Sequence, residues 1–260
     1  MLLENKVAIV TGGSRGIGYA TVEAFLKEGA KVVLCASRQE TADKAVGQLK
    51  EAYPEAEVEG IFPNLSDCET VKAAFDGVAE KYGKIDILVN NAGVSESTPF
   101  TEYTAETFEK VMDLNIKGVY NCSKAASEHM IAAGSGVILN TSSMVSQYGQ
   151  PAGIAYPTSK FAVNGFTLSL ARELGPKGIR VNAVAPGFFV NDRSRKILFA
   201  ADGNLSKRGE NIMNHTPMGR FGEAKELWGC VSWLLDDEKA GFVTGITVPV
   251  DGGFLAHSGI

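Results

Sequence analysis

The 260-residue sequence has few of the residues that bind metals or cross-link small proteins. Its four cysteines lie far apart without a CxxC pair, and only three histidines accompany them, so we expect no metal site. A chain of this length buries roughly 75% of its unfolded surface, so neither a disulfide nor a metal is needed to hold a core. Cys35 and Cys122 lie in apolar runs and are predicted to be small core residues.

Long apolar runs and an excess of positive charge are also absent. No run approaches the roughly 18 residues of a membrane-spanning helix, and the first residues, MLLENKVAIV, lack the basic start and long apolar core of a signal peptide. The net charge of −5 argues against nucleic acid or an anionic membrane as the main partner. The sequence therefore predicts a cytoplasmic protein.

Short β-branched runs alternate with longer segments of helical periodicity. Strands are expected at 6–10, 31–34, 58–62, 85–89, 136–140, 180–184 and 246–250. Helices are expected at 20–28, 40–52, 68–82, 105–133, 155–173 and 224–235. This alternation predicts an α/β, doubly wound Rossmann fold with a seven-stranded parallel sheet and helices on both faces. The ligand crevice of such a sheet lies outside the carboxyl ends of the strands.

No linker or shift in composition divides the chain, so we expect one Rossmann-type domain over residues 1–260. Residues 188–218 break the regular alternation, because they form a long segment of mixed polarity with two glycines. A segment of this size between a strand and a helix is more often functional than a plain connection. We expect a substrate lid here, and a disordered surface loop is the alternative.

A glycine-rich segment, Thr11–Gly18, directly follows the first predicted strand and opens into a helix. Glycines let the backbone turn sharply and approach a pyrophosphate, and the free N–H groups of a helix N-terminus favour negative charge. In this position the segment predicts a dinucleotide site. The simpler interpretation is a turn and a helix cap.

The residues at the end of the second strand indicate which adenosine ribose, that of NAD or that of NADP, the site would bind. An acidic residue there would bind the 2′-hydroxyl of NAD, whereas arginine suits the 2′-phosphate of NADP. Here Ser37 and Arg38 follow the strand with no carboxylate before Glu40, and Arg15 supplies a second cation. Two guanidinium groups favour NADP(H), with NAD(H) as the alternative cofactor. The simpler interpretation is a pair of solvated surface arginines.

Tyr156 and Lys160 lie four residues apart and share one face of a predicted helix. A free phenol has a pKa near 10, and a nearby ammonium lowers it by about 1–3 units. The pair could then transfer a proton to or from a carbinol oxygen near neutral pH. This spacing alone is common in exposed helices.

Other polar residues are expected near the same edge of the sheet. Ser143 is predicted to close the fifth strand, where its hydroxyl could hold a substrate oxygen. Asn90–Gly93 follows the fourth strand, and Pro186 with Gly187 follows the sixth. Asn115 lies inside a predicted helix between apolar neighbours, where the presence of a polar side chain requires an explanation.

With these motifs in this order and spacing, the sequence resembles the single-domain short-chain dehydrogenase/reductase family over essentially its whole length. The resemblance implies an NAD(P)-dependent oxidoreductase that interconverts a secondary alcohol and a ketone. It implies that Tyr156 is the acid/base and that Ser143 positions the substrate oxygen. It further implies that Lys160 supports Tyr156 and binds the nicotinamide ribose, while Asn115 holds a water that links Lys160 to solvent.

The resemblance also implies the cofactor contacts, the assembly and the small-molecule nature of the substrate. The implied contacts are Gly12, Ser14, Arg15, Gly16, Ile17, Gly18, Ser37, Arg38, Asn64, Leu65, Asn91, Ala92, Gly93, Tyr156, Lys160, Pro186, Gly187, Phe189 and Asn191. Asn64 stands where the family often has aspartate, and Asn191 stands where it usually has threonine. Both keep a hydrogen-bonding side chain, so activity is expected with altered local contacts. Family members commonly form tetramers through the helices at 105–133 and 155–173 here, so we expect a homotetramer.

The predicted substrate contacts are Ser143, Met144, Tyr148 and Phe188. Further pocket candidates are Gln147, Pro151, Phe189 and Val190. Most are apolar or aromatic, which suits a bulky apolar ketone, although the two phenylalanines could instead pack the lid. The rim cations Arg193, Arg195 and Lys196 could attract a carboxylate, or could form a solvated face.

On the substrate, the resemblance favours two classes. The first two-thirds of the chain is similar to bacterial bile-acid hydroxysteroid dehydrogenases, and the last third to sugar-acid oxidoreductases such as mannonate or gluconate dehydrogenases. An apolar pocket with a cationic rim matches an apolar acid, so a hydroxysteroid is favoured. A 3-oxoacyl carrier-protein reductase is a further alternative, but it would need a basic docking patch. A non-enzymatic cofactor sensor would have no need of Ser143, Tyr156 and Lys160 together.

Overall fold

The computed structural model describes residues 1–257, apart from the side chains of Asp192 and Arg193. Seven parallel strands form one sheet in the order β3-β2-β1-β4-β5-β6-β7. The strands are β1 (Val7–Thr11), β2 (Lys31–Cys35), β3 (Val58–Ile61), β4 (Ile87–Asn90), β5 (Gly136–Thr141), β6 (Ile179–Pro186) and β7 (Thr247–Val250). This confirms the predicted doubly wound α/β fold.

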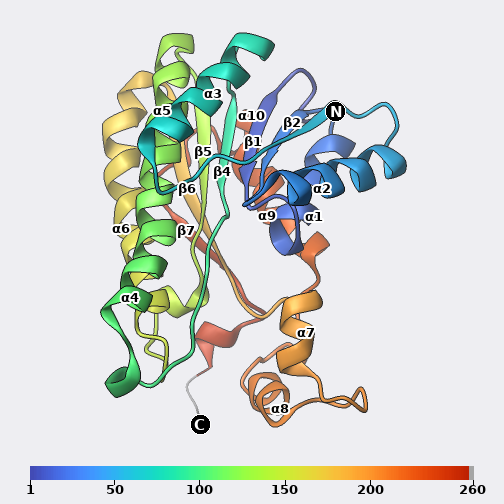
Figure 1. The fold of residues 1–260 in the computed structure, drawn as a ribbon, viewed down its shortest axis with the longest axis vertical. Coiled ribbons are helices and arrows are strands. Elements are labelled where there is room, and N and C mark those ends of the chain that lie inside the picture. The colour runs from blue at the N-terminus through green and yellow to red at the C-terminus, as the bar shows by residue number, and fades with distance from the viewer. Residues whose placement is uncertain (258–260) are drawn as a thin grey trace.

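Helices cover both faces of the sheet (Figure 1). One face carries α1 (Gly16–Lys27), α2 (Gln39–Ala52) and α9 (Ala224–Leu235). The other carries α3 (Cys68–Tyr82), α5 (Gly118–Ala133) and α6 (Ala155–Leu174). Among residues 1–257, no helix combines the length and apolarity that a membrane span requires.

The central strands β1, β2 and β4 are nearly continuous apolar runs because they are buried on both faces. Successive side chains of a strand point to opposite sides. In β1, Ala8 and Val10 therefore join the core beneath α1, α2 and α9, while Val7 and Ile9 join the core beneath α3, α5 and α6. Cys35 and Cys122 are each 1% exposed, which confirms them as core residues.

The single helix predicted at 105–133 is divided in the structure. A π-helical turn of five residues, Asp113–Lys117, joins α4 (Ala105–Met112) to α5. A π turn accommodates an extra residue and often occurs at functional sites. Asn115 lies in this turn and is fully buried. The π turn therefore accounts for a polar residue between apolar neighbours, which the helical periodicity alone did not explain.

The segment predicted as a lid contains two short helices, α7 (Asp192–Leu198) and α8 (Lys207–Asn214), which lie beyond the carboxyl edge of the sheet (Figure 1). Each of its two ends is held by a backbone hydrogen bond to a residue outside the segment. The Val190 N–H donates to the Gly222 carbonyl at 3.2 Å, and the Met218 N–H donates to the Gly252 carbonyl at 3.1 Å. The segment is therefore a folded pair of helices on a fixed base.

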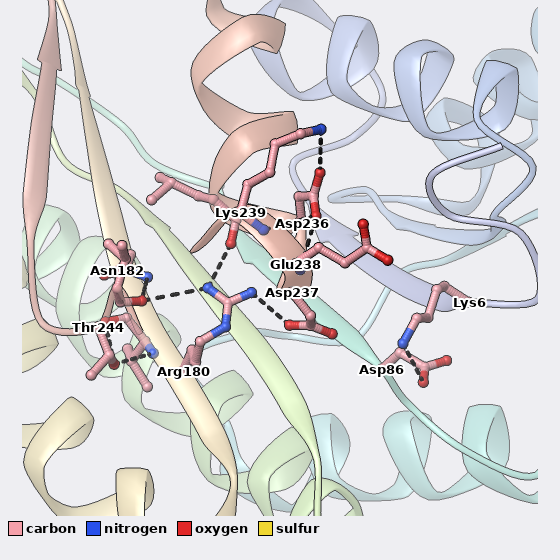
Figure 2. Close-up of polar contacts among 12 residues, drawn as sticks. Lys6, Asp86, Arg180, Asn182, Asp236, Asp237, Glu238, Lys239 and Thr244 are labelled. Carbon is pink, nitrogen blue, oxygen red and sulfur yellow. Dashed lines mark hydrogen bonds and ion pairs between the residues drawn. The ribbon is translucent and has the colours of Figure 1, made fainter. Parts of the chain in front are cut away.

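At the opposite, amino-terminal edge of the sheet, Arg180 anchors β6 (Figure 2). The residue is 8% exposed, and its side chain donates to the Leu234 carbonyl at 2.7 Å and to the Asp237 carboxylate at 2.9 Å. This links β6 to α9 and to α10 (Asp237–Ala240). A cavity of about 980 Å³ lies beside this anchor. The cavity lies at the amino-terminal edge of the sheet, opposite the carboxyl edge where the glycine-rich segment and the predicted catalytic residues lie.

Candidate active site

The glycine-rich segment forms a cradle between β1 and α1. Gly12 and Gly16 have φ angles of +65° and +58°, a left-handed conformation that favours glycine. A Cβ on Gly18 would collide with the carbonyl oxygen of Gly12, so glycine is needed for α1 to begin against the strand end. A Cβ on Gly16 would meet only the amide nitrogen of Asn191, at 4.0 Å, so the backbone there faces open space.

The start of α1 lies at this cradle. Arg15 precedes the helix in an extended conformation, and its described side chain forms no hydrogen bond that caps the first turn. The N–H groups of that turn therefore have no side-chain cap, which suits an anionic ligand. Ser14 and Ile17 are partly buried beside the exposed Arg15. Together with the glycines, these residues fit the pyrophosphate of a dinucleotide.

The loops after β1 and β4 are clamped side by side. The Thr11 hydroxyl oxygen accepts hydrogen bonds from the N–H groups of Asn91 and Ala92, at 2.9 and 3.0 Å. The Asn91 side-chain amide donates to the Thr11 carbonyl at 3.0 Å and to the Gly12 carbonyl at 3.3 Å. The structure thus brings Asn91 and Ala92 to the cradle.

The two arginines of the predicted NADP site follow neighbouring strands. The register pairs the last residues of β1 and β2, and the Gly13 N–H donates to the Cys35 carbonyl at 3.1 Å. Arg15 therefore follows the strand adjacent to the one that Arg38 follows, and both side chains are exposed, as is Ser37. No acidic residue lies between Cys35 and Arg38.

Two other predicted cofactor contacts lie after β3. The Asn64 side-chain oxygen accepts a hydrogen bond from the Ser66 N–H at 3.1 Å, so its amide shapes the turn in which it lies. Leu65 is 9% exposed, and its carbonyl accepts a hydrogen bond from the Asn121 side chain at 2.9 Å. Asn64 itself is exposed.

The ammonium of Lys160 lies 5.7 Å from the ring centroid of Tyr156. Lys160 is 5% exposed and donates to the carbonyl oxygen of Thr141, the last residue of β5, at 2.7 Å. Burial lowers the pKa of Lys160 to about 8. Tyr156 is half-buried, and Ser143 is 7% exposed just beyond the strand end.

Asn115 links the π turn to the segment that follows β4. Its side chain accepts from the Val94 N–H and donates to the Val94 carbonyl, both at 2.9 Å. It also donates to the Ser159 hydroxyl at 3.0 Å. A Cβ on Gly93 would lie 3.2 Å from the Asn115 oxygen and 3.8 Å from the Lys160 nitrogen. Asn115, Gly93 and Lys160 are thus neighbours although they are distant in sequence.

Reasoning from the sequence missed Asn164, which holds the loop that carries Ser143. Its side-chain oxygen accepts from the hydroxyls of Ser142 at 2.7 Å and Thr247 at 3.2 Å, and its amide donates to the Ser146 hydroxyl at 2.9 Å. The Ser146 hydroxyl in turn donates to the Ser143 carbonyl at 2.6 Å.

A sequence signal for Asn164 did exist. It lies four residues after Lys160, which lies four residues after Tyr156, so all three share one face of α6. A polar residue on the face that packs against the sheet requires a partner.

Further predicted cofactor and substrate contacts lie next to Ser143 or at and beyond the end of β6. The Phe189 side chain is 6% exposed and packs in the core against Gly222, and Met144 is 3% exposed. The Asn191 side chain accepts from the Ser194 N–H at 3.0 Å in the first turn of α7. A Cβ on Gly187, which follows Pro186, would lie 2.7 Å from the Cα of Asp251.

Three aromatic rings from distant parts of the chain pack against one another. The ring of Phe254 lies 5.6 Å from that of Tyr148 and 5.4 Å from that of Phe188, between centroids. We call these three residues the aromatic wall. Burial raises the pKa of the Tyr148 phenol, the Arg208 guanidinium opposes that rise and the Tyr156 phenol adds to it.

Comparison with known proteins agrees with this geometry. The profile of the family described as short chain dehydrogenase matches residues 6–198. The chain is 52% identical over 252 residues to a 3alpha-hydroxysteroid dehydrogenase of Mediterraneibacter gnavus, covering 97% of this chain and 98% of the relative. It is 36% identical to the 3-oxoacyl-[acyl-carrier-protein] reductase FabG of Thermotoga maritima, covering 98% and 100%. The chain belongs to the short-chain dehydrogenase family and is an oxidoreductase.

Solved structures extend the comparison to cofactors. A putative D-mannonate oxidoreductase from Haemophilus influenza with bound NAD superposes with a TM-score of 0.93 at 30% identity, covering 99% of this chain and 98% of that one. A gluconate 5-dehydrogenase from Burkholderia cenocepacia in complex with NADP and tartrate gives 0.89 at 30% identity, covering 98% and 96%. These similarities support a nicotinamide cofactor and a small-molecule substrate.

Proposed function

We propose that the protein is an NADP(H)-dependent hydroxysteroid dehydrogenase that interconverts a secondary alcohol and a ketone on a bile-acid skeleton. The observation that carries this proposal is the buried ammonium of Lys160, which lies beside the Tyr156 ring and near Gly93. Gly93 belongs to the loop that is hydrogen-bonded to the glycine cradle, and this cradle fits a dinucleotide. An ammonium near a phenol favours the phenolate. It therefore prepares Tyr156 to give and take a proton.

Each side chain has one part in the proposed reaction. The hydroxyls of Ser143 and Tyr156 hold the substrate oxygen, and Tyr156 donates its proton to that oxygen when the ketone is reduced. Lys160 stabilises the phenolate that remains, and a water held at Asn115 returns a proton through Lys160 from solvent. When bound, the nicotinamide supplies or accepts the hydride.

The preference for NADP(H) rests on the two exposed arginines. Arg15 and Arg38 follow adjacent strands at the carboxyl edge, where a 2′-phosphate would gain charge-assisted hydrogen bonds from both. The cradle would hold the pyrophosphate, and Lys160 with Tyr156 would hold the nicotinamide ribose. NAD(H) is the alternative cofactor.

The steroid class is supported by two observations. The M. gnavus relative, 52% identical, is a 3alpha-hydroxysteroid dehydrogenase. The aromatic wall offers a broad apolar surface, which suits a rigid apolar body better than a polyol. A sugar acid is the second candidate, supported by the mannonate and gluconate enzymes among the structural neighbours.

The substitution Tyr156→Phe tests the mechanism and the cofactor together. We expect it to lower turnover of a 3-oxo bile acid by roughly 10²–10⁴-fold, because the proton donor is lost. Fluorescence titration should show that the variant still binds NADPH, because the cradle and Lys160 remain, and that it binds NADH more weakly than NADPH. Unchanged turnover would refute the mechanism, and tighter NADH binding would refute the cofactor preference. Turnover of a keto-sugar acid but no bile acid would replace the steroid with the second candidate.

We also propose a single domain with a moving lid at residues 188–218 and a homotetrameric assembly. The lid proposal is supported by the two short helices α7 and α8 and by the backbone hydrogen bonds that hold the two ends of the segment. The assembly is supported by large apolar side chains on the outer faces of α5 and α6. Tyr120, Phe161 and Leu168 are 49%, 51% and 61% exposed.

A further inference from the structure

The aromatic wall differs from the other group of rings beyond the strand ends. In that group the rings of Phe199 and Phe221 lie 5.8 Å apart between centroids. The guanidinium carbon of Arg195, which the sequence predicted as a rim cation, lies 5.2 Å from the Phe199 ring centroid. That group is built within the lid and its base. The aromatic wall instead takes each of its rings from the end of a different strand.

The three rings of the wall follow three adjacent strands. Tyr148 follows β5, Phe188 follows β6 and Phe254 follows β7. Because β6 pairs in parallel with β5 on one side and with β7 on the other, these strands end at the same edge of the sheet. Tyr148 also lies in the loop that joins Ser143 to Tyr156. The wall therefore adjoins the loop that carries both hydroxyls of the proposed reaction.

Phe254 contacts both other rings of the wall. Its ring centroid lies 5.6 Å from that of Tyr148 and 5.4 Å from that of Phe188, with interplanar angles of 42° and 68°. Ring pairs at this separation attract each other beyond the effect of burial alone. All three residues are only partly buried, so the wall retains apolar surface that a substrate can cover. Phe254 therefore links the ring in the Ser143 loop to the ring at the end of β6.

Asp251, the first residue after β7, fixes the turn that carries Phe254. Its two carboxylate oxygens accept hydrogen bonds from the N–H groups of Gly253 and Leu255, both at 2.9 Å. Hydrogen bonds to a charged acceptor are stronger than those between neutral groups. A Cβ on Gly253, whose φ angle is +87°, would lie 3.1 Å from the Pro217 side chain. The turn is therefore held by a carboxylate and packs closely against the end of the lid.

We propose that Phe254 is a positioning residue for substrate binding: its ring holds the rings of Tyr148 and Phe188 in one arrangement before the substrate arrives, and the Asp251 carboxylate holds Phe254. This inference rests on the proposed function and assigns part of the substrate affinity to the turn after β7. A side chain that is already ordered loses less conformational entropy on binding. The wall therefore binds an apolar body more tightly when Phe254 braces it. The effect is on binding alone, because other groups hold the substrate oxygen.

Phe254→Ala tests the inference in the whole enzyme, with a 3-oxo bile acid as substrate. We expect KM to rise about tenfold while kcat stays within about twofold, which is the pattern of a lost interaction that the ground state and the transition state share. The NADPH Kd should stay within about twofold, because the glycine cradle is distant from the turn after β7. Phe254→Tyr keeps the ring and should return KM to within about twofold of the wild type.

A double-mutant cycle separates positioning from general damage to the fold. Asp251→Asn keeps the size of the side chain but offers one acceptor where the carboxylate offers two, so it should raise KM about fivefold. Added to Phe254→Ala it should raise KM no further, because both changes act through the same ring. The control is Phe242→Ala, an exposed phenylalanine at the amino-terminal edge of the sheet. It should leave KM and kcat within about twofold.

Any of four results would overturn the inference: an unchanged KM in Phe254→Ala, a parallel loss of kcat and NADPH affinity, no rescue by Phe254→Tyr, or additive effects of the two substitutions in the cycle. Phe254→Leu, which is apolar but has no ring, gives the same comparison if the alanine variant does not fold. A wild-type enzyme that turns over no 3-oxo bile acid would instead refute the proposed function. The two failures are thus distinguishable in one set of assays.

Discussion

Lys160 is held in surroundings that disfavour its charge. Its ammonium is buried and donates to a neutral carbonyl, and burial lowers the pKa to about 8 from the ordinary 10.5. Because the folded-state pKa is the lower one, the unfolded chain binds more protons between these two values. The free energy of unfolding contributed by Lys160 therefore rises as the pH increases from about 8 to 10.5. Below pH 8 the protonated lysine destabilises the fold.

Lys160→Met should therefore stabilise the protein at pH 7 while it removes turnover. The pKa difference corresponds to roughly 3 kcal/mol, and the lost hydrogen bond to Thr141 offsets about 1 kcal/mol. We expect Tm to rise by several degrees at pH 7, with a smaller gain near pH 10. Thermal unfolding across this pH range checks the prediction, and the exposed Lys177→Met is the control. A lower Tm at pH 7 would contradict it.

At this scale, local spacing indicated some of the contacts seen in the structure and missed others. Tyr156 and Lys160 were recognisable because a helix fixes the geometry of residues four apart. Phe254 gave no such signal, since its ring meets that of Tyr148 only through the tertiary fold. Phe189 was expected at the cofactor, yet its ring packs in the core, because two adjacent phenylalanines in an extended segment point to opposite sides.

Among the elements, α6 and the end of β5 form the frame of the site. Asn164 joins them through Ser142 and Ser146, and it also accepts from Thr247 on β7. The Ser146 hydroxyl passes this restraint to the carbonyl of Ser143. Asn164 is thus a positioning residue for Ser143, with no role as a proton donor.

Asn164→Ala should lower kcat about tenfold, because a small displacement of Ser143 misplaces the substrate oxygen. The NADPH Kd should stay within about twofold, since the glycine cradle is not involved. Asn164→Asp keeps the acceptor for Ser142 and Thr247 but loses the donor to Ser146, so its kcat shows which bond matters. Thr158→Ala, an exposed change on the same helix, is the control. Equal losses of kcat and cofactor affinity would indicate general unfolding instead.

The long amphipathic elements were predictable from the sequence because burial imposes a regular period. The helices at Cys68–Tyr82 and Ala224–Leu235 have the expected bounds. The π turn was not predictable, since one extra residue leaves the apolar pattern on either side unchanged. The two helices of the lid were also missed, because they are short and polar and depend on contact with each other.

For the whole molecule, the exposed apolar residues of α5 and α6 predict the assembly. Leu168→Arg should convert the proposed tetramer into smaller species, because it places an unpaired charge in an apolar interface. Light scattering of the wild type and the variant measures the change in mass. Phe62→Arg replaces a residue that is 49% exposed just after the edge strand β3, and it should leave the mass unchanged. A monomeric wild type would refute the assembly.

The strand order also affects the order in which parts of the sheet can form during folding. The central strand β1 pairs with β2 on one side but with β4 on the other, where Ala8 lies opposite Ile87. The centre of the sheet cannot close until that distant strand has been synthesised and the intervening crossovers have formed. Sheets built from such non-local pairs fold slowly, and partly formed ones expose strand edges that aggregate. The segments that form the cradle are synthesised before the residues beyond β4, so we expect the nucleotide half of the sheet to pair before the half that carries Tyr156.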